Sequence, residues 1–300
     1  MIKSDIKPPF TWATSPKQEG QENEDSHLCV KSKSASIAGV MDGIGGAPEG
    51  EKASTQSAKL LFHALNVMNY RRSPEEIAEH LQKCLQGADH HLKQLAAIGR
   101  LHRDAGTCAV LAAVFQSPTC ESLVRDVAVA WAGDCRCMAY MPDNTLRSLT
   151  IDNVSGVRLV GWNMIKSRIV TTHQPILSSV TRSEELDTQE KRRAFLNRNV
   201  VDSILTATAE CPAPQYATSV VRVPVGTRLI LCSDGLVDNL TDVDIQTILQ
   251  KTPFEKAASI LVEQAIERSH SDHFRAKPDD ITVVQVSIEN AARAANVTLF

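Results

Sequence analysis

The sequence predicts an α+β fold in which helices pack on the outer faces of antiparallel sheets. Apolar runs rich in Val and Ile, bounded by turn residues, recur along the 300 residues, and in several places one run follows another directly. Longer segments with helical spacing come in two pairs between these runs. A doubly wound parallel sheet would need strict alternation of strand and helix, so this order favours antiparallel sheets.

Eight strands are expected from the apolar runs. Each run is short, contains β-branched residues and is bounded by turn residues, which is typical of strands. They cover residues 26–30, 35–41, 106–115, 127–132, 137–141, 219–223, 228–233 and 281–288.

Four helices are expected, and Ser73 marks the start of one of them. Ser73 is followed by Pro74 and two glutamates, which is a good helix N-terminus with proline in the first turn. Another helix opens with small residues after Gly50, and the two later helices each begin after a Thr. The four cover residues 50–68, 74–97, 242–250 and 254–268.

The composition excludes several classes of function. Hydrophobic residues make up 43% of the chain, charged residues 22%, and the net charge is -3, as in an ordinary soluble globular protein. No basic field would attract nucleic acid or an anionic membrane. The N-terminal segment lacks the apolar centre of a secretion signal, and no run approaches the roughly 20 apolar residues that span a bilayer. We therefore expect a cytoplasmic protein with neither a nucleic-acid nor a membrane partner.

The eight cysteines are scattered without a C-x-x-C pair, and most lie inside strand-like apolar runs. This pattern predicts buried, reduced thiols. It argues against a zinc site or a disulfide framework.

The stretch IAGVMDGIGG places Asp42 and four glycines at the end of an apolar run. A phosphate-binding loop would need Lys and then Ser or Thr where the chain has Glu51 and Lys52, and a dinucleotide loop would need glycine at Pro48. The alternative is a metal site, because the glycines allow a sharp turn that leaves a carboxylate and a carbonyl facing one space, and such oxygen ligands suit Mg²⁺ or Mn²⁺. Taken alone, however, Asp-Gly after a strand is more often a turn.

Three further places put an acidic residue beside an apolar strand. Glu24 and Asp25 precede one strand, Asp234 follows another, and Asp279 with Asp280 precedes the last. Each could be a turn at a strand end. Together with Asp42 they could bring at least four carboxylates to one edge of the sheets, where they would repel one another unless a cation neutralised them.

Six segments, in order along the chain, resemble the metal-dependent serine/threonine protein phosphatases of type 2C. The resemblance covers roughly residues 14–288 and implies two packed antiparallel sheets flanked by helix pairs. The segments are N-E-D-S (23–26), G-V-M-D-G-I-G-G with G-E-K-A-S (39–54), A-G-T-C-A-V (105–110), A-G-D-C-R (132–136), L-I-L-C-S-D-G-L-V-D (229–238) and K-P-D-D-I-T-V-V (277–284).

The resemblance also implies one domain, because ligands from both ends of the chain must meet. We expect this domain at residues 14–290, with tails at 1–13 and 291–300. The least regular region, at about 153–215, carries the charged run SEELDTQEKRR and is expected to be a flap-like insert.

The resemblance assigns metal ligands residue by residue. Asp42 is implied to bridge two Mn²⁺ or Mg²⁺ ions, and the backbone carbonyl of Gly43 to bind one of them. Asp234 and Asp279 are implied to bind the other ion. Asp134 in G-D-C-R matches a position that in bacterial relatives serves a third, weaker ion, and otherwise is an Asp in a tight strand turn.

Catalysis is implied to proceed through water activated by the metal pair. Asp25 would supply a further carboxylate, directly or through water, and Glu24 would orient coordinated water. No protein nucleophile is then needed. None of the eight cysteines has Arg six positions later, so the signature loop of cysteine phosphatases is absent.

The sequence departs from the family pattern at three positions. Gly20 stands where many members carry an arginine that grips the substrate phosphate, and Lys17 or a basic residue from elsewhere could substitute. Ile44 replaces a histidine of eukaryotic members, as in bacterial relatives. Asp280 replaces a common asparagine and leaves Asp279 intact.

The predicted function is hydrolysis of phosphoserine and phosphothreonine in proteins. The expected partners are phosphoprotein substrates and an opposing Ser/Thr kinase, and the expected oligomeric state is a monomer. The alternative is a phosphatase-like binding or regulatory module with weak turnover, for which the missing phosphate arginine is the support.

Overall fold

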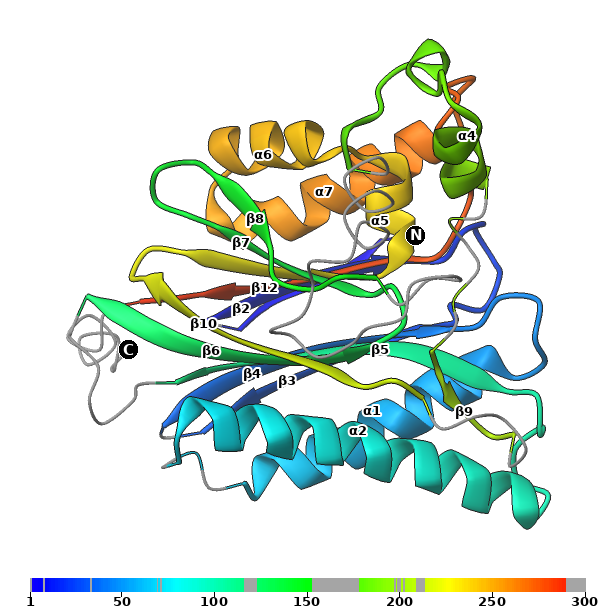
Figure 1. Cartoon of the computed structure of the whole chain (residues 1–300), viewed down its shortest axis with the longest axis vertical. Helices are drawn as coiled ribbons and strands as arrows, with labels where there is room; N and C mark the ends of the chain where they lie inside the picture. Colours follow the sequence, from blue (N-terminus) through cyan, green and yellow to red (C-terminus); the bar gives the residue numbers. More distant parts are fainter. Residues whose placement is uncertain are drawn as a thin grey trace.

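Two antiparallel sheets stack face to face at the centre of the molecule, and helices cover both outer faces (Figure 1). The structure is a computed structural model that describes residues 2–7, 9–32, 34–68, 70, 72–115, 123–152, 178–196, 198, 201, 203–208 and 214–289. The architecture confirms the predicted α+β class with two antiparallel sheets.

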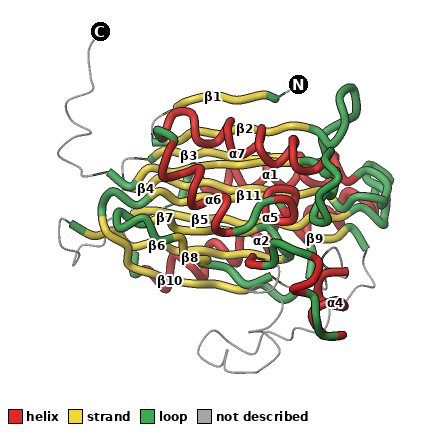
Figure 2. Tube along the Cα trace, turned by 90° about the horizontal axis from the view of Figure 1, so that it is seen from above, coloured by secondary structure: helices red, strands yellow, loops and turns green. Residues whose placement is uncertain are grey.

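The sheets are assembled from strands that are distant in sequence. The first sheet has the order β1 (Lys3–Lys7), β2 (Phe10–Ser15), β12 (Ile281–Ser287), β11 (Arg228–Cys232), β7 (Arg136–Tyr140) and β8 (Leu146–Ser148). The second has the order β10 (Ala217–Pro224), β6 (Val124–Ala132), β5 (Gly106–Phe115), β4 (Ala35–Gly43) and β3 (Asp25–Lys31), with the short β9 (Leu205–Thr206) paired to β5. Seen from above, β1 and β10 lie at opposite edges of the molecule (Figure 2).

Side chains alternate along the strands of the second sheet because successive residues point to opposite faces. On β4, Ala38 and Val40 belong to the core between the two sheets, together with Trp131 of β6. Ile37 and Met41, on the same strand, belong to the core between this sheet and its helices. The central strands β4, β5 and β6 are therefore buried on both faces, which explains their nearly continuous apolar sequences.

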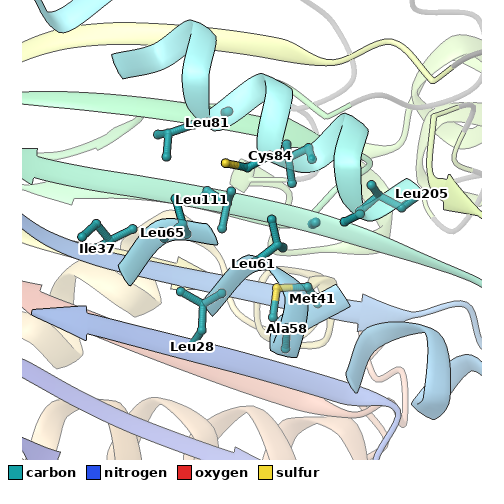
Figure 3. Close-up of a cluster of buried hydrophobic side chains, with 14 of the residues drawn as sticks. Leu28, Ile37, Met41, Ala58, Leu61, Leu65, Leu81, Cys84, Leu111 and Leu205 are labelled. Atoms are coloured by element: carbon teal, nitrogen blue, oxygen red, sulfur yellow. The ribbon is translucent and has the colours of Figure 1, made fainter. Parts of the chain in front are cut away.

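The helices α1 (Gly50–Asn66) and α2 (Pro74–Ala97) cover the outer face of the second sheet. Leu61 of α1 and Leu81 of α2 pack in one cluster with Leu111 of β5 (Figure 3). The predicted start of α2 is confirmed as a capping box, in which the Ser73 Oγ accepts from the Glu76 amide at 3.2 Å and Glu76 Oε2 accepts from the Ser73 amide at 2.9 Å.

The helices α5 (Asp234–Asn239), α6 (Asp242–Lys251) and α7 (Phe254–Ser269) cover the outer face of the first sheet. Ile245 of α6 and Leu261 of α7 pack with Ile230 of β11 in this third cluster. The four predicted helices are confirmed, whereas α5 was missed because six residues are too few to display a helical period.

The predicted N-terminal tail at residues 1–13 is wrong. Phe10–Ser15 forms β2, which pairs with β12, and β1 pairs with β2 at the edge of the sheet. Phe10 lies in the core between the two sheets and Ala13 lies in the core under the helices, so this strand is buried on both faces although its sequence mixes apolar and polar residues. The predicted C-terminal tail, 291–300, lies outside the described residues.

The region predicted as a flap-like insert is described only in part. Residues 153–177 lie outside the described residues. Its later part contains a 3₁₀ turn at Ser183–Glu185, the helix α4 (Gln189–Leu196) and β9.

Six cysteines fall within the described part of the chain, and all six are free thiols, as predicted. Five are buried and Cys29 is half-buried, while Cys120 and Cys211 lie outside the described residues. No helix in the described part of the chain combines the length and hydropathy that crossing a bilayer requires.

Candidate metal centre

Acidic residues from both sheets meet at one end of the sandwich. Asp25 opens β3 and lies opposite Asp42 near the end of β4, because antiparallel neighbours place the start of one strand beside the end of the next. Asp234 follows β11, Asp279 precedes β12 and Asp134 lies in the turn between β6 and β7. The structure therefore brings together the carboxylates that the sequence analysis selected.

Asp42 is the most crowded of these carboxylates. Burial raises its pKa well above the ordinary value, and the charges of Asp25, Asp234, Asp134 and Asp279 raise it further. Like charges gathered in this way favour proton uptake or the binding of a cation.

Asp25 has one oxygen that is hydrogen-bonded and one that is not. The Ser233 hydroxyl donates to its Oδ2 at 2.8 Å, and Ser233 Oγ also accepts from the Thr282 amide at 2.9 Å. The buried Oδ1 has no hydrogen-bond partner among the described residues. Burial raises the pKa of Asp25 well above its usual range, with Asp280 and Asp279 adding to the rise. A buried carboxylate oxygen without a partner is costly, and a metal ion would satisfy it.

Gly43 is required by close packing at the start of α1. A β-carbon at this position would lie 2.5 Å from the carbonyl oxygen of Gly50 and 2.8 Å from that of Glu24. The backbone on either side is fixed, since the Gly43 amide donates to the Glu24 carbonyl at 3.1 Å and the Thr107 hydroxyl donates to the Asp42 carbonyl at 2.8 Å. The Asp-Gly step therefore joins β3, β4 and α1 at the centre.

Asp134 lies deeper, in a turn that depends on Gly133. Gly133 has φ +99°, and a β-carbon there would collide with the Cys108 side chain. Burial raises the pKa of Asp134 to about 8, and the negative charges of Asp234 and Asp152 contribute to the rise.

A lysine that the sequence analysis did not select lies among the carboxylates. Lys277 Nζ is 2.7 Å from Asp234 Oδ2, 2.7 Å from Asp238 Oδ2 and 3.0 Å from Asp279 Oδ2. The available signals were the lysine two residues before Asp279, and the spacing of Asp234 and Asp238, which are four residues apart and so share a helix face.

Lys277 shifts the pKa values of Asp234 and Asp279 to different extents. Burial works to raise the pKa of Asp234, but Lys277 reverses this and the pKa of Asp234 is lowered. Burial raises the pKa of Asp279 to about 6 with a contribution from Asp234, and Lys277 opposes the rise. Burial alone would lower the pKa of Lys277, whereas its three carboxylate partners raise that pKa well above its ordinary value.

Asp280 connects the chain before β3 to the start of β12. Its Oδ1 accepts from the Lys17 amide at 2.6 Å, and its Oδ2 accepts from the Glu24 amide at 2.6 Å. Only a carboxylate has two acceptor oxygens for this purpose, which gives a physical reason for Asp where the family commonly has Asn.

Glu24 and Lys17 lie at the edge of the centre. Lys17 Nζ is 3.9 Å from Glu24 Oε2, and burial raises the pKa of Glu24. The Lys17 side chain is 38% exposed and so accessible to a ligand, whereas Gly20 lies in an exposed turn.

The carboxylate and carbonyl oxygens of this centre are of the type that binds a hard divalent cation. They are not arranged around a single point as they would be around a bound ion. No three His, Cys, Asp or Glu side chains in the described ranges are already arranged as a metal site. Lys277 binds the Oδ2 atoms of Asp234 and Asp279, which occupies those oxygens, and Asp25 Oδ1 has no partner among the described residues. Oxygen donors of this type are those that Mg²⁺ and Mn²⁺ prefer.

Comparison with known proteins identifies the family. Residues 14–276 match the family model described as protein phosphatase 2C. The chain belongs to the protein phosphatase 2C family. The predicted resemblance is thereby confirmed, and with it the enzyme class, a metal-dependent serine/threonine protein phosphatase.

Individual relatives of this family are similar over most of their length. A serine/threonine phosphatase stp of Listeria innocua is 25% identical over 246 residues, which cover 81% of this chain and 84% of the relative. The solved Mycobacterium tuberculosis serine/threonine phosphatase PstP/Ppp has a TM-score of 0.66 at 20% identity, covering 96% of this chain and 99% of that one.

A further solved structure is the catalytic domain of the phosphatase PstP in complex with two manganese ions. It has a TM-score of 0.60 at 19% identity and covers 96% of this chain and 100% of that one. These two structures confirm the fold of the present chain.

Proposed function

We propose that this chain hydrolyses phosphoserine and phosphothreonine in proteins, with two Mn²⁺ or Mg²⁺ ions held by Asp25, Asp42, Asp234, Asp279 and the carbonyl of Gly43. The observation that carries the assignment is that the charges of Asp25, Asp234 and Asp279, from both sheets, all act on Asp42, which lies opposite an Asp25 whose Oδ1 has no partner among the described residues. Bound divalent ions supply an activated water and neutralise the phosphoryl oxygens.

The chain's own residues would position the ions and the attacking water. Carboxylates of both sheets act on Asp42 through their charges, so Asp42 is the residue that would hold both ions. Ser233 fixes the Asp25 side chain through its hydroxyl, and Glu24, at the edge of the centre, is placed to orient water.

Cysteine nucleophiles are disfavoured in the same region. Burial raises the pKa of Cys232 to about 12 and raises the pKa values of Cys108 and Cys135 well above the ordinary value. These side chains are therefore neutral thiols and poor nucleophiles at pH 7. Their burial supports attack by water.

The first prediction concerns turnover. Asp42→Asn and Asp279→Asn keep the side-chain shape but remove a charge from the centre, so each should lower Mn²⁺-dependent hydrolysis of p-nitrophenyl phosphate and of a phosphothreonine peptide by about 10²–10³-fold. Asp134→Asn should have a smaller effect. The matched control is Asp143→Asn in the exposed turn before β8, where the carboxylate accepts only from its neighbour Thr145 among the bonds described, and turnover should be unchanged.

Two results would count against the proposal. Near-normal turnover of Asp42→Asn at saturating Mn²⁺ would show that the ligand assignment is wrong. Absence of metal-dependent turnover in the unchanged chain would favour the alternative of a phosphatase-like binding module.

We also propose the setting in which the enzyme works. Hydrolysis of phosphoproteins requires an opposing Ser/Thr kinase that produces the substrate. The chain is expected to act as a cytoplasmic monomer, and size-exclusion chromatography with light scattering tests the oligomeric state.

A further inference from the structure

Lys277 is a cation that the chain itself places inside the carboxylate cluster. Its ammonium contacts Asp234 and Asp238 on α5 and Asp279 before β12, all within 3.0 Å. An ammonium has three N–H donors, and this one donates to Asp234 Oδ2 and Asp238 Oδ2 and forms an ion pair with Asp279 Oδ2. Its side chain is 13% exposed, unlike that of a surface lysine.

The backbone of Lys277 is held as firmly as its side chain. The Lys277 amide donates to Asn239 Oδ1 at 3.0 Å, and Asn239 Nδ2 donates to the Lys277 carbonyl at 2.9 Å. Asn239 is the last residue of α5, and its Nδ2 also donates to the Gly235 carbonyl at 2.9 Å. The lysine and the helix that carries two of its partners therefore form one unit.

Asp238 adds an argument from charge. It is 2% exposed and lies beside two cations, Lys277 and Arg198, whose Nε is 3.5 Å from Asp238 Oδ2. A divalent ion bound to the same Asp238 oxygen would stand within a few ångströms of the ammonium, where like charges in a buried site repel strongly. The ammonium and such an ion exclude each other.

We infer that the Lys277 ammonium takes the place of a divalent ion among Asp234, Asp238 and Asp279, so that the centre takes two divalent ions and has no position for a third. This inference rests on the proposed function. Asp134, which the resemblance assigns to a third ion, lies near enough to Asp234 and Lys277 for both charges to act on it, so the ammonium also opposes an ion there. Asp42, Asp25 and the oxygens of Asp234 and Asp279 that do not face Lys277 remain for the two ions. Lys277 is in this sense a positioning residue that fixes the ion count.

The test is the Mn²⁺ stoichiometry of the full-length chain, measured by isothermal titration calorimetry and by equilibrium dialysis with elemental analysis. The unchanged chain should bind two Mn²⁺ per molecule and Lys277→Met should bind three. Adding Asp238→Asn to Lys277→Met should return the count to two. The matched control is Lys17→Met, which removes the same charge at the edge of the centre without touching these three carboxylates, and it should stay at two.

A second measurement uses the unchanged chain, so it does not require that any variant folds. Anomalous diffraction from crystals of the unchanged chain grown with Mn²⁺ should show two metal peaks, with Lys277 Nζ still among its three carboxylates. A third peak, whether at Asp134 or between Asp234 and Asp238, or a lysine side chain displaced from its carboxylates, would overturn the inference.

The outcomes separate the inference from the proposed function. Three Mn²⁺ ions on the unchanged chain, or two on Lys277→Met, would overturn the inference and leave the phosphatase mechanism standing. No Mn²⁺ on the unchanged chain would overturn both.

Discussion

Arg136 is a buried residue at the start of β7, two positions after Asp134 of the metal centre. It follows the Asp134 turn and makes a two-pronged contact with Asp152, with Nε 2.9 Å from Oδ1 and Nη2 2.6 Å from Oδ2. The two side chains are 2% and 5% exposed, so the pair is shielded from water. Paired guanidinium and carboxylate groups of this geometry are strong and directional.

Arg136→Met should therefore destabilise the fold by about 3 kcal/mol, because it leaves the Asp152 carboxylate buried without this partner. Asp152→Leu added to Arg136→Met should recover part of the loss, since both charges are then absent. Urea unfolding monitored by tryptophan fluorescence measures both variants. A loss below about 1 kcal/mol for the single variant would mean that the ion pair contributes little.

At the residue scale, the sequence was sufficient to select the carboxylates that the structure brings close together and insufficient for their neighbours. Asp42 and Asp234 were found because each follows an apolar strand in a quoted motif. Lys277 and Ser233 were missed because nothing in a linear pattern tells which non-ligand side chains will turn towards the carboxylates. The Asp280 contacts with two amides are likewise set by tertiary packing.

At the scale of elements, β3 of the second sheet and β2 of the first are joined by a ring contact. His27 and Trp12 have ring centroids 4.1 Å apart. Burial lowers the pKa of His27 to about 4 from its ordinary value near 6.5. Between these two pH values the unfolded chain binds a proton that the folded chain does not, so this histidine makes stability fall as pH falls through that window.

His27→Gln should remove this contribution. On going from pH 7 to pH 4.5, the unchanged chain should lose about 1–3 kcal/mol more unfolding free energy than the His27→Gln variant loses. Urea unfolding at both pH values gives the difference directly. Equal pH dependence of the two proteins would show that His27 is protonated equally in the folded and unfolded states.

Strand prediction succeeded for long, continuous apolar runs and failed for β2, whose sequence has no such run. The runs that became β4, β5 and β6 are buried on both faces, so the sequence shows them as unbroken apolar segments. β2 mixes apolar and polar residues and pairs with β1, and its place inside the sheet is set by its pairing with β12. That pairing joins residues about as far apart as the chain allows, which no local pattern can show.

At the scale of the whole molecule, the metal centre joins the two sheets. Asp25 and Asp42 belong to the second sheet, while Asp234 and Asp279 flank strands of the first. The carboxylates repel one another across this boundary, so a cation bound between them should stabilise the stacked arrangement by mass action.

Mn²⁺ at about 100 times its dissociation constant should raise stability by about 2.7 kcal/mol and the melting temperature by about 5 °C. Excess EDTA should reverse the shift, and Asp42→Asn should show little of it. Differential scanning fluorimetry with and without Mn²⁺ measures the effect. A shift of equal size in Asp42→Asn would place the stabilising ion elsewhere.

The position of β12 also has a consequence for biosynthesis. This strand lies between β2 and β11 in the interior of the first sheet, and the residues just before it supply Asp279, Asp280 and Lys277. A nascent polypeptide that has emerged from the ribosome only as far as α7 thus lacks an interior strand of that sheet. It also lacks Asp279, Asp280 and Lys277 of the metal centre. Dephosphorylating activity should switch on abruptly, late in translation, when residues 277–287 leave the exit tunnel.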